Sequence, residues 1–319
     1  MEIMDQAANL RKLAGERSES APPSGGVGAT TLERTELEEI SEPETRRGRV
    51  VAVTSGKGGV GKSTLSVNMA IALGRLGKKV LLFDGDLGLA NINVLMGIIP
   101  EFSIYEVLKG KKKLSDIIIP TGFGIDIIAG ANGISQLANL TDAQRDLFVE
   151  QLSELEGYDV LLIDTGAGVG SNVLGLVLPA DDIVVVTTPE PTAITDAYGM
   201  IKSIVAASGA TKKIKLIVNR APSAIEAKRV SDRLMSISGQ FLKVGVESLG
   251  FVFEENLVQK SIRSQRPHVV LYPGSKSAAC INHIGARLVN ASVKEDSQGI
   301  FAFFQQFLGL GQSRNNEEA

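Results

Sequence analysis

The sequence predicts an α/β fold, in which a mainly parallel β-sheet carries helices on both faces. Short apolar runs recur along the chain and are continuous rather than alternating, which is typical of strands buried on both faces. Helical patterns fall between most of these runs, and strands that alternate with helices form right-handed βαβ units. A glycine-rich loop directly follows the first run, at the carboxyl end of the expected strand, where such folds bind their ligands.

The expected elements follow in chain order. Strands are expected over residues 50–54, 79–84, 125–129, 159–164, 182–188, 215–219 and 248–253, with 269–272 as a further candidate. Helices are expected over residues 63–76, 142–155 and 195–207, where apolar residues recur at helical spacing. Because ligands bind outside the carboxyl ends of parallel strands, the functional residues are expected just after these runs.

Composition divides the chain into four parts. Residues 1–14 show a short amphipathic helical pattern, and a helix this short needs a partner or the domain to order it. Residues 15–48 are rich in Gly, Ser, Pro, Thr and Glu and hold no aromatic residue, which indicates a flexible linker. The folded domain is expected over residues 49–290, and residues 291–319 form a C-terminal tail.

Composition also excludes several classes of protein. The 319 residues are 44% apolar and 22% charged, as in a globular protein with a sizeable core, and no stretch reaches the roughly 18 apolar residues of a membrane-spanning helix. The N-terminus carries Glu2 and Asp5 and lacks the basic and apolar regions of a secretory signal. The single cysteine, Cys280, excludes an intramolecular disulfide and fits a reducing compartment, so we expect a cytoplasmic protein.

Charge and histidine content point to no further site. The formal net charge is −3, and no part of the chain is basic enough to predict nucleic-acid binding. His268 and His283 have no partners at the spacing that a metal site or a nucleophilic site requires, so both are expected to be structural.

The glycine-rich loop has the pattern G-x-x-x-x-G-K-[ST] between a strand and a helix, which predicts a nucleoside triphosphate site. Its residues are Gly56, Lys57, Gly58, Gly59, Val60, Gly61, Lys62, Ser63 and Thr64. Glycines let backbone N–H groups converge on phosphate oxygens, and the N-terminus of the following helix adds its positive dipole. Lys62 is expected to bridge the β- and γ-phosphates and Ser63 to bind Mg²⁺.

The second lysine in this loop, Lys57, makes the chain resemble the deviant Walker A ATPases of the MinD/ParA type, whose loop reads KGGVGK[ST]. The resemblance implies a P-loop ATPase fold, ATP and Mg²⁺ as ligands, and an ATP-dependent homodimer. It also implies that Lys57 reaches the phosphates bound by the other subunit, so that hydrolysis needs two subunits.

Further residues at strand ends match the same family. Asp84 and Asp86 follow the second strand, and the resemblance implies that Asp86 aligns the attacking water while Asp84 supports Mg²⁺ through water. Asp164 ends an apolar strand in the Walker B form and is expected to hold the Mg²⁺ shell. Asn219 is implied to bind the adenine base, with Arg220 beside it.

The N-terminus indicates the subfamily. Residues 5–11 resemble the D-Q-A-x-x-L-R motif of the flagellar number regulators called FlhG, FleN or YlxH. In that family the motif binds the signal-recognition-type GTPase FlhF and stimulates it, which implies partner contacts by Asp5, Gln6, Leu10 and Arg11. Flagellar motor-ring components are a further partner class that the resemblance leaves open. The alternatives are a MinD-type regulator of the cell-division site and a ParA-type DNA partition ATPase.

A cluster of phenylalanines lies in the C-terminal tail. Over residues 299–311 the apolar side chains occupy half of a helical circle, which predicts an amphipathic helix. One interpretation is a membrane-targeting helix, as in MinD-like proteins, that attaches the ATP-bound dimer to the inner face of the cell membrane. Its membrane-facing residues would be Ile300, Phe301, Phe304, Phe307 and Leu308. The other interpretation is a terminal helix packed on the domain or on a partner subunit.

Overall fold

The computed structural model describes residues 48–86, 91–130, 141–155, 157–209, 211–292 and 297–309. The helix predicted over residues 1–14, the partner residues Asp5, Gln6, Leu10 and Arg11, and all but the last residue of the predicted linker lie outside the described residues.

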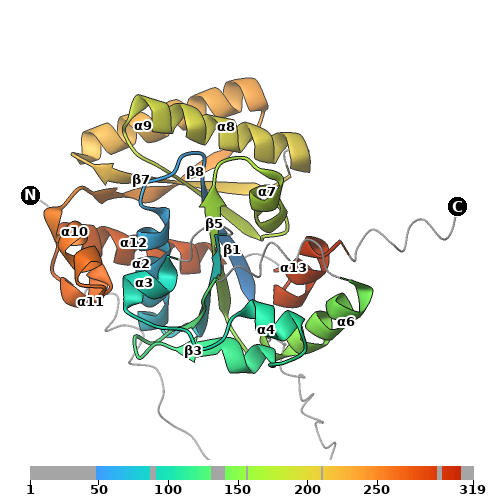
Figure 1. Cartoon of the computed structure of the whole chain (residues 1–319). Coiled ribbons are helices and arrows are strands. Elements are labelled where there is room, and N and C mark those ends of the chain that lie inside the picture. The colour runs from blue at the N-terminus through green and yellow to red at the C-terminus, as the bar shows by residue number, and fades with distance from the viewer. Residues whose placement is uncertain are drawn as a thin grey trace, which may run out of the picture. The chain divides into compact units, whose positions relative to one another are not determined.

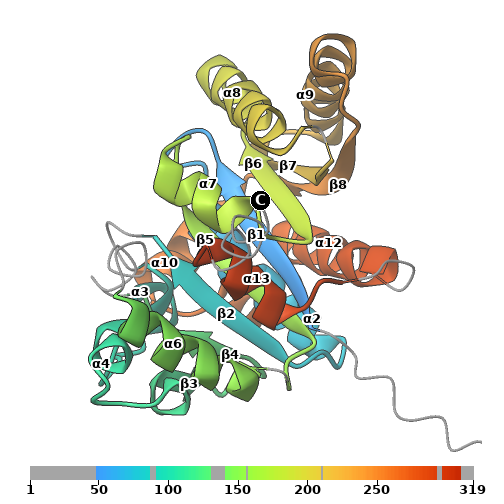
Figure 2. The same cartoon turned by 90° about the vertical axis from the view of Figure 1, so that its right-hand side faces the viewer.

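An eight-stranded sheet forms the centre of the domain, in the order β3-β4-β2-β5-β1-β6-β7-β8 (Figures 1 and 2). Neighbouring strands are parallel except for β3 and β4, which pair antiparallel. The strands are β1 (Arg49–Ser55), β2 (Val80–Gly85), β3 (Ile118–Pro120), β4 (Asp126–Ile128), β5 (Val160–Ala167), β6 (Asp182–Thr187), β7 (Lys213–Ala221) and β8 (Val246–Phe253). This order confirms the predicted mainly parallel sheet.

Helices cover both faces of the sheet, as predicted. On one face the core contains residues of α2 (Lys62–Arg75), α3 (Ile92–Met96), α11 (His268–Leu271) and α12 (Lys276–Ser292). On the other face it contains residues of α4 (Ile104–Leu108), η1 (Leu114–Ile117), α6 (Asp142–Gln151), η2 (Leu152–Leu155), α7 (Ser171–Val177), α8 (Pro191–Ser208), α9 (Ala224–Ile237) and α13 (Ile300–Phe307). The remaining elements are η3 (Ser238–Leu242) and α10 (Asn256–Arg263).

Strand β1 explains why the apolar runs are continuous. Val50 and Ala52 contribute to the core on the α7–α9 side, whereas Val51 and Val53 contribute to the core on the α2–α12 side. Because successive side chains of a strand point to opposite faces, a strand covered on both faces needs an apolar residue at every position.

Two short elements differ from the prediction. Residues 269–272 were a strand candidate, but most of this run belongs to α11, in which the backbone N–H groups of Val270 and Leu271 donate to the carbonyl of Pro267. A four-residue apolar run does not distinguish a buried strand from a buried helical turn, so this prediction was wrong. The edge strand β3 was not predicted, because it has only three residues and ends in Pro120.

The C-terminal tail does form a helix, α13, but its apolar face is turned into the domain. Ile300, Phe303 and Phe304 are buried, and the Phe304 ring makes edge-on contacts with Phe83 of β2 and Phe148 of α6. Burial of these rings against the core removes more apolar surface from water than an exposed tail helix would. The core therefore extends beyond the predicted boundary at residue 290.

This packing corrects the prediction for the membrane-facing residues. Ile300, Phe304 and Leu308 are core residues in this structure, so a membrane contact by these side chains is wrong for this conformation, and the alternative of a helix packed on the domain is the one observed. Phe301 is 37% exposed, and Phe307 is half-buried against the same core. Among the described residues, no helix has both the length and the apolar character needed to cross a bilayer.

A single carboxylate ties the start of α13 to the sheet. Asp181, just before β6, accepts hydrogen bonds from the backbone N–H groups of Val50 and Gln298 and from the Ser297 hydroxyl, at 2.8, 3.0 and 3.2 Å. Ser297 Oγ also lies 3.0 Å from the carbonyl oxygen of Gly48, so its single hydroxyl hydrogen is shared between this oxygen and Asp181. These bonds hold the segment before α13 at the amino end of β1.

Candidate nucleotide site

The glycine-rich loop connects β1 to α2 in the conformation that a phosphate cradle requires. Gly61, the N-cap of α2, has φ 89°, and a Cβ atom there would lie 2.5 Å from the amide nitrogen of Asn219. A Cβ on Gly56 would lie 2.0 Å from the carbonyl oxygen of Asp196. Only glycine fits both positions. No described side chain caps α2, so its first N–H groups remain available to an anion.

Lys62 and Asp164 form a buried pair behind this loop. The lysine Nζ donates to Asp164 Oδ1 at 2.8 Å, and Ser66 Oγ donates to the same oxygen at 3.0 Å. The second carboxylate oxygen, Oδ2, is buried and has no hydrogen-bond partner among the described residues. A buried acceptor without a donor is costly, and it is suited to a hydrated cation.

Asp84 lies beside Asp164 because β2 and β5 pair in parallel, with these two residues in register. Its Oδ1 accepts the N–H of Asp86, and its Oδ2 accepts those of Asn91 and Ile92. Burial, together with the charge of Asp164, raises the pKa of Asp84 to about 6. Two buried carboxylates side by side repel each other, and a divalent cation between them would relieve that repulsion.

The residues predicted for Mg²⁺ fit such a cation. Asp84 and Asp164 come together, and Ser63 is the second residue of α2, directly after Lys62. Within the described parts of the chain, no group of three or more His, Cys, Asp or Glu side chains could hold a metal by itself. Mg²⁺ usually keeps several waters and binds few protein groups, so Ser63, phosphate oxygens and waters bound by the two carboxylates would suit it here.

Asp86, predicted to align the attacking water, faces the end of β5. A Cβ atom on Gly166 would lie 3.6 Å from Asp86 Oδ1, which is an ordinary contact distance and places this part of the backbone beside the carboxylate. The following Gly168 has φ 92° and donates to the carbonyl of Ser55. The glycines after Asp164 therefore bring the backbone of this segment close to both the P-loop and Asp86.

Lys57 lies at the rim of the site. Its Nζ donates to Thr192 Oγ1 at 2.7 Å and to Glu190 Oε2 at 3.0 Å, and its side chain is 36% exposed. Glu190 is the N-cap of α8, after the carboxyl end of β6. Glu190 was not among the site residues predicted from the sequence. The signal for a site residue was an acid at a carboxyl strand end.

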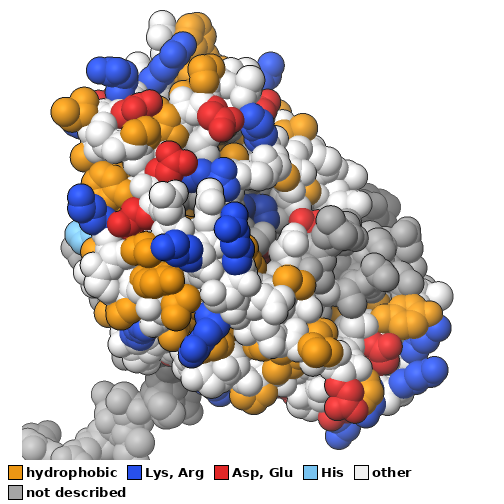
Figure 3. All heavy atoms as spheres, turned by 60° about the vertical axis from the view of Figure 1, so that its left-hand side comes forward, with side chains coloured by type: hydrophobic (Ala, Val, Ile, Leu, Met, Phe, Trp, Pro, Cys, Tyr) orange, Lys and Arg blue, Asp and Glu red, His pale blue; other side chains and the backbone are white. Residues whose placement is uncertain are grey.

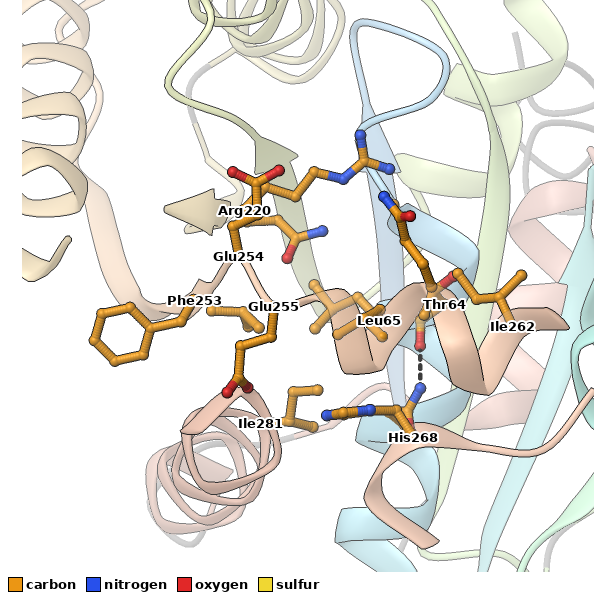
Figure 4. A pocket seen from close by; sticks show the side chains of 15 residues that line it. Thr64, Leu65, Arg220, Phe253, Glu254, Glu255, Ile262, His268 and Ile281 are labelled. Atoms are coloured by element: carbon orange, nitrogen blue, oxygen red, sulfur yellow. Dashed lines mark hydrogen bonds between the residues drawn. The ribbon is translucent and has the colours of Figure 1, made fainter. Parts of the chain in front are cut away.

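Asn219 and Arg220 lie at the end of β7, on the other side of the loop. Asn219 Nδ2 donates to the carbonyl of Val60 at 2.8 Å, so this side chain supports the P-loop from beneath. Arg220 has φ 52°, an uncommon backbone conformation for a non-glycine residue. Both residues line a pocket with Thr64, Phe253, Glu254 and Ile262, into which the base of a nucleotide could extend (Figure 4).

The far wall of this pocket was missed from the sequence. Glu254 and Glu255 follow β8, and Val258 and Ile262 belong to α10. Their position after the carboxyl end of a strand was the available signal, but they match no motif. Figure 4 shows Glu255, Ile281 and His268 on the wall that α10, α11 and α12 share.

His268, for which the sequence predicts a structural role, lies in a buried hydrogen-bond network beside the pocket. Its Nε2 lies 2.8 Å from Ser275 Oγ and 2.6 Å from Ser277 Oγ, and Ser277 donates to Glu255 Oε2 at 2.5 Å. Burial lowers the pKa of His268. Burial acts to raise the pKa of Glu255, but the hydrogen bonds from Ser277 outweigh it and lower that pKa. The network joins α10, α11 and α12 behind the pocket.

The tail residues are not part of this site. Ile300 lies beside Gly48, at the amino end of β1, whereas the P-loop follows the carboxyl end. Figure 3 shows the side of the molecule that carries α10 and α11, on which Lys and Arg side chains are mixed with hydrophobic and acidic ones rather than gathered in one stripe.

The fold and the site define a P-loop nucleoside triphosphatase with a second lysine in its loop. A family model described as an AAA domain matches residues 48–216. The chain is 33% identical to the antiactivator FleN of Pseudomonas aeruginosa over 261 residues, which are 82% of this chain and 93% of FleN. It is also 33% identical to the flagellum site-determining protein YlxH of Helicobacter pylori, over 82% of this chain and 90% of YlxH.

Solved structures of related proteins have the same fold. The septum site-determining protein MinD of Pyrococcus horikoshii, complexed with Mg-ADP, superposes with a TM-score of 0.61 at 26% identity, over 77% of this chain and 98% of MinD. A chain of the MinC:MinD complex of Aquifex aeolicus gives a TM-score of 0.63 at 27% identity, over 79% and 100%. The chain belongs to the MinD/ParA-type P-loop ATPases, in the family that includes FleN and YlxH.

Proposed function

We propose that this protein is a Mg²⁺-dependent ATPase switch that dimerises with ATP and regulates the number or placement of flagella. The main support is the position of Lys57, which is partly exposed at the rim of the site, whereas Lys62, Asp84 and Asp164 are buried. A lysine at the rim can reach outward to a second subunit, whereas Lys62 is committed to its own site.

The residues divide the work of hydrolysis among themselves. Loop N–H groups and Lys62 bind the phosphates, and Ser63, Asp84 and Asp164 hold the hydrated Mg²⁺, which neutralises phosphate charge. Asp86 orients the attacking water. Lys57 of the facing subunit stabilises the charge that develops in the transition state, so hydrolysis is slow until two subunits meet.

The flagellar role rests on the relatives, which are named as an antiactivator and as a flagellum site-determining protein. In this proposal the segment with Asp5, Gln6, Leu10 and Arg11 stimulates the GTPase FlhF, and motor-ring components are further partners. The protein also attaches to the inner face of the cell membrane in this proposal, on one structural condition. Because Ile300, Phe304 and Leu308 are buried, α13 must leave the core before it can bind lipid.

Size-exclusion chromatography with light scattering, run with ATP and Mg²⁺, tests the switch. Asp86→Ala is expected to give a stable ATP-bound dimer, Lys57→Ala to keep ATP binding but lose hydrolysis, and Lys62→Ala to lose binding. Lys111→Ala, an exposed lysine away from the site, is the matched control. A Lys57→Ala protein that hydrolyses ATP at the wild-type rate would contradict the role of this lysine.

A second experiment separates the flagellar role from the alternatives. The protein is tested with and without residues 1–14 for pull-down of FlhF and for stimulation of FlhF GTP hydrolysis. Binding and stimulation are expected only when these residues are present. ATP-dependent, salt-sensitive binding to nonspecific DNA would instead favour a partition ATPase.

A further inference from the structure

The two edges of the sheet differ in how they are protected. The β3 edge is three residues long and ends in Pro120, so it offers little backbone to another strand. The β8 edge is eight residues long, with the sequence VESLGFVF, and contains neither proline nor lysine. Proline, lysine and short length are three of the usual means by which proteins block an edge, and β8 has none of them; its one charged side chain is Glu247, and its pairing with β7 shifts register between Ser248 and Gly250.

A groove runs along this open edge between α9 and α12 (Figure 2, where β8 lies at the rim of the sheet with α9 above it and α12 below). Ser248, Gly250 and Phe251 of β8 line it. Small side chains on both helices, Ala224 and Ala227 on α9 and Ala279 on α12, leave room beside the strand. The groove has a volume of about 720 Å³.

Charged side chains at the rim of this groove are mainly basic. Lys228 on α9 and Arg287 on α12 are exposed, and Asp232, the one acid among the lining residues, already pairs with Lys228 at 2.6 Å. Arg287 Nη2 donates to the carbonyl of Ser248 at 3.0 Å. The exposed Arg287 side chain therefore occupies one backbone carbonyl of the edge strand. A ligand could displace this side chain and use the carbonyl as its own acceptor.

We propose that the β8 edge binds an extended segment of a partner protein, with a β-branched apolar centre and acidic residues at its ends. Backbone hydrogen bonds to β8 would provide affinity, as in other cases of strand addition. The apolar centre would contact Phe251, Met235 and Ile284, and the acidic ends would pair with Lys228 and Arg287. This surface is separate from the nucleotide site and from α13.

The single cysteine of the chain gives a direct test, because Cys280 is half-buried in the wall of the groove. The probe is the capped peptide Asp-Glu-Val-Ile-Val-Thr-Glu-Asp, added to the full-length protein, and the readout is the rate of maleimide labelling of Cys280. Binding is expected to slow labelling several-fold. Two matched peptides, one with lysine at the four acidic positions and one with proline in place of the central isoleucine, are expected to give no protection.

Protein variants test the charges. Arg287→Glu and Lys228→Glu are each expected to weaken the peptide about fivefold to tenfold, as loss of one charge pair with added repulsion would do. Arg233→Glu, which reverses an exposed charge on α9 outside the groove, is the matched control and should bind like the wild type. ATPase activity reports that each variant is folded.

Three outcomes would overturn the proposal. They are no protection at millimolar peptide, equal protection by the proline peptide, and unchanged affinity in both charge-reversal variants. Amide hydrogen exchange provides an independent check, since strand addition should slow exchange in β8 and leave the β3 edge unchanged.

Discussion

Lys62 and Asp164 are joined by a 2.8 Å hydrogen bond in the interior of the protein, and the side chains are 8% and 1% exposed. This pair links the phosphate loop to β5, the strand whose Asp164 is proposed to hold Mg²⁺, so the contact joins the two halves of the proposed site. Because the partner oxygen Asp164 Oδ2 has no donor among the described residues, the lysine is the main compensation for the buried carboxylate charge.

Removal of Lys62 should therefore affect stability as well as binding. Lys62→Ala leaves Asp164 buried and without its cation, and we expect the free energy of unfolding to fall by about 3–5 kcal/mol without nucleotide. Urea denaturation measures this change. The double variant Lys62→Ala/Asp164→Asn is the control and should recover part of the loss. A single variant as stable as the wild type would show that the pair contributes little.

Substitution of Asp84 is expected to change the free energy of unfolding in the opposite direction. Its pKa in the folded protein, about 6, is above the unfolded value of 3.8, so ionisation disfavours the folded state. The cost is fully present above pH 6 and disappears as the pH falls from 6 toward 3.8. Asp84→Asn is therefore expected to raise the free energy of unfolding by about 2–3 kcal/mol at pH 7.5 without Mg²⁺.

The measurement is urea denaturation of wild type and Asp84→Asn at pH 7.5 and at pH 5. The gain should shrink at the lower pH, because the wild-type carboxyl group is then largely protonated in the folded protein. The same substitution should weaken Mg²⁺-dependent hydrolysis. A gain that does not change with pH would assign the effect to packing instead of charge.

Glu190 and Thr192 hold Lys57 within its own subunit, so they should influence how readily the lysine reaches another one. Glu190→Gln is expected to change the stability of the monomer by less than about 1 kcal/mol, because the ion pair is exposed. We expect a larger effect on the ATP-dependent dimer and on the hydrolysis rate, measured by light scattering and phosphate release. An unchanged rate would show that Lys57 is not limited by this contact.

The strongly patterned parts of the molecule could be predicted from the sequence. Continuous apolar runs such as β1 and β5 fix a sheet that is buried on both faces, and the P-loop spacing fixes the position of Lys62 and Ser63 after the first strand. Asp84 and Asp164 could be expected on the same side of the sheet, because the carboxyl ends of parallel strands lie together. Their side-by-side register and the raised pKa of Asp84 depend on which strands are neighbours, which the sequence does not reveal.

Residues whose role depends on distant packing could not be predicted. Glu255, Ser277 and His268 form one network, yet each lies on a different segment and belongs to no motif. The direction of the apolar face of α13 was also open, because a half-circle of phenylalanines fits a membrane and a protein core equally well. The rings of Phe83 and Phe148 decide between the two, and neither is near α13 in sequence.

The burial of α13 leads to a prediction that compares two phenylalanines on the same helix. Phe304 is 2% exposed and contacts three other rings, whereas Phe301 is 37% exposed. Phe304→Ala is expected to lower the free energy of unfolding by about 3–5 kcal/mol, the usual cost of removing a buried ring. Phe301→Ala should cost less than about 1 kcal/mol, as substitutions of exposed residues usually do.

Chemical denaturation of the full-length protein compares the two variants, and liposome sedimentation shows whether either one affects lipid binding. If α13 must leave the core to bind lipid, loosening it with Asp181→Ala should increase the sedimented fraction, because that carboxylate anchors Ser297 and Gln298. Phe304→Ala loosens the helix but also removes an apolar lipid contact, so it should bind less than Asp181→Ala. Equal stability losses for the two phenylalanines, or no lipid binding by Asp181→Ala, would leave α13 as a purely structural helix.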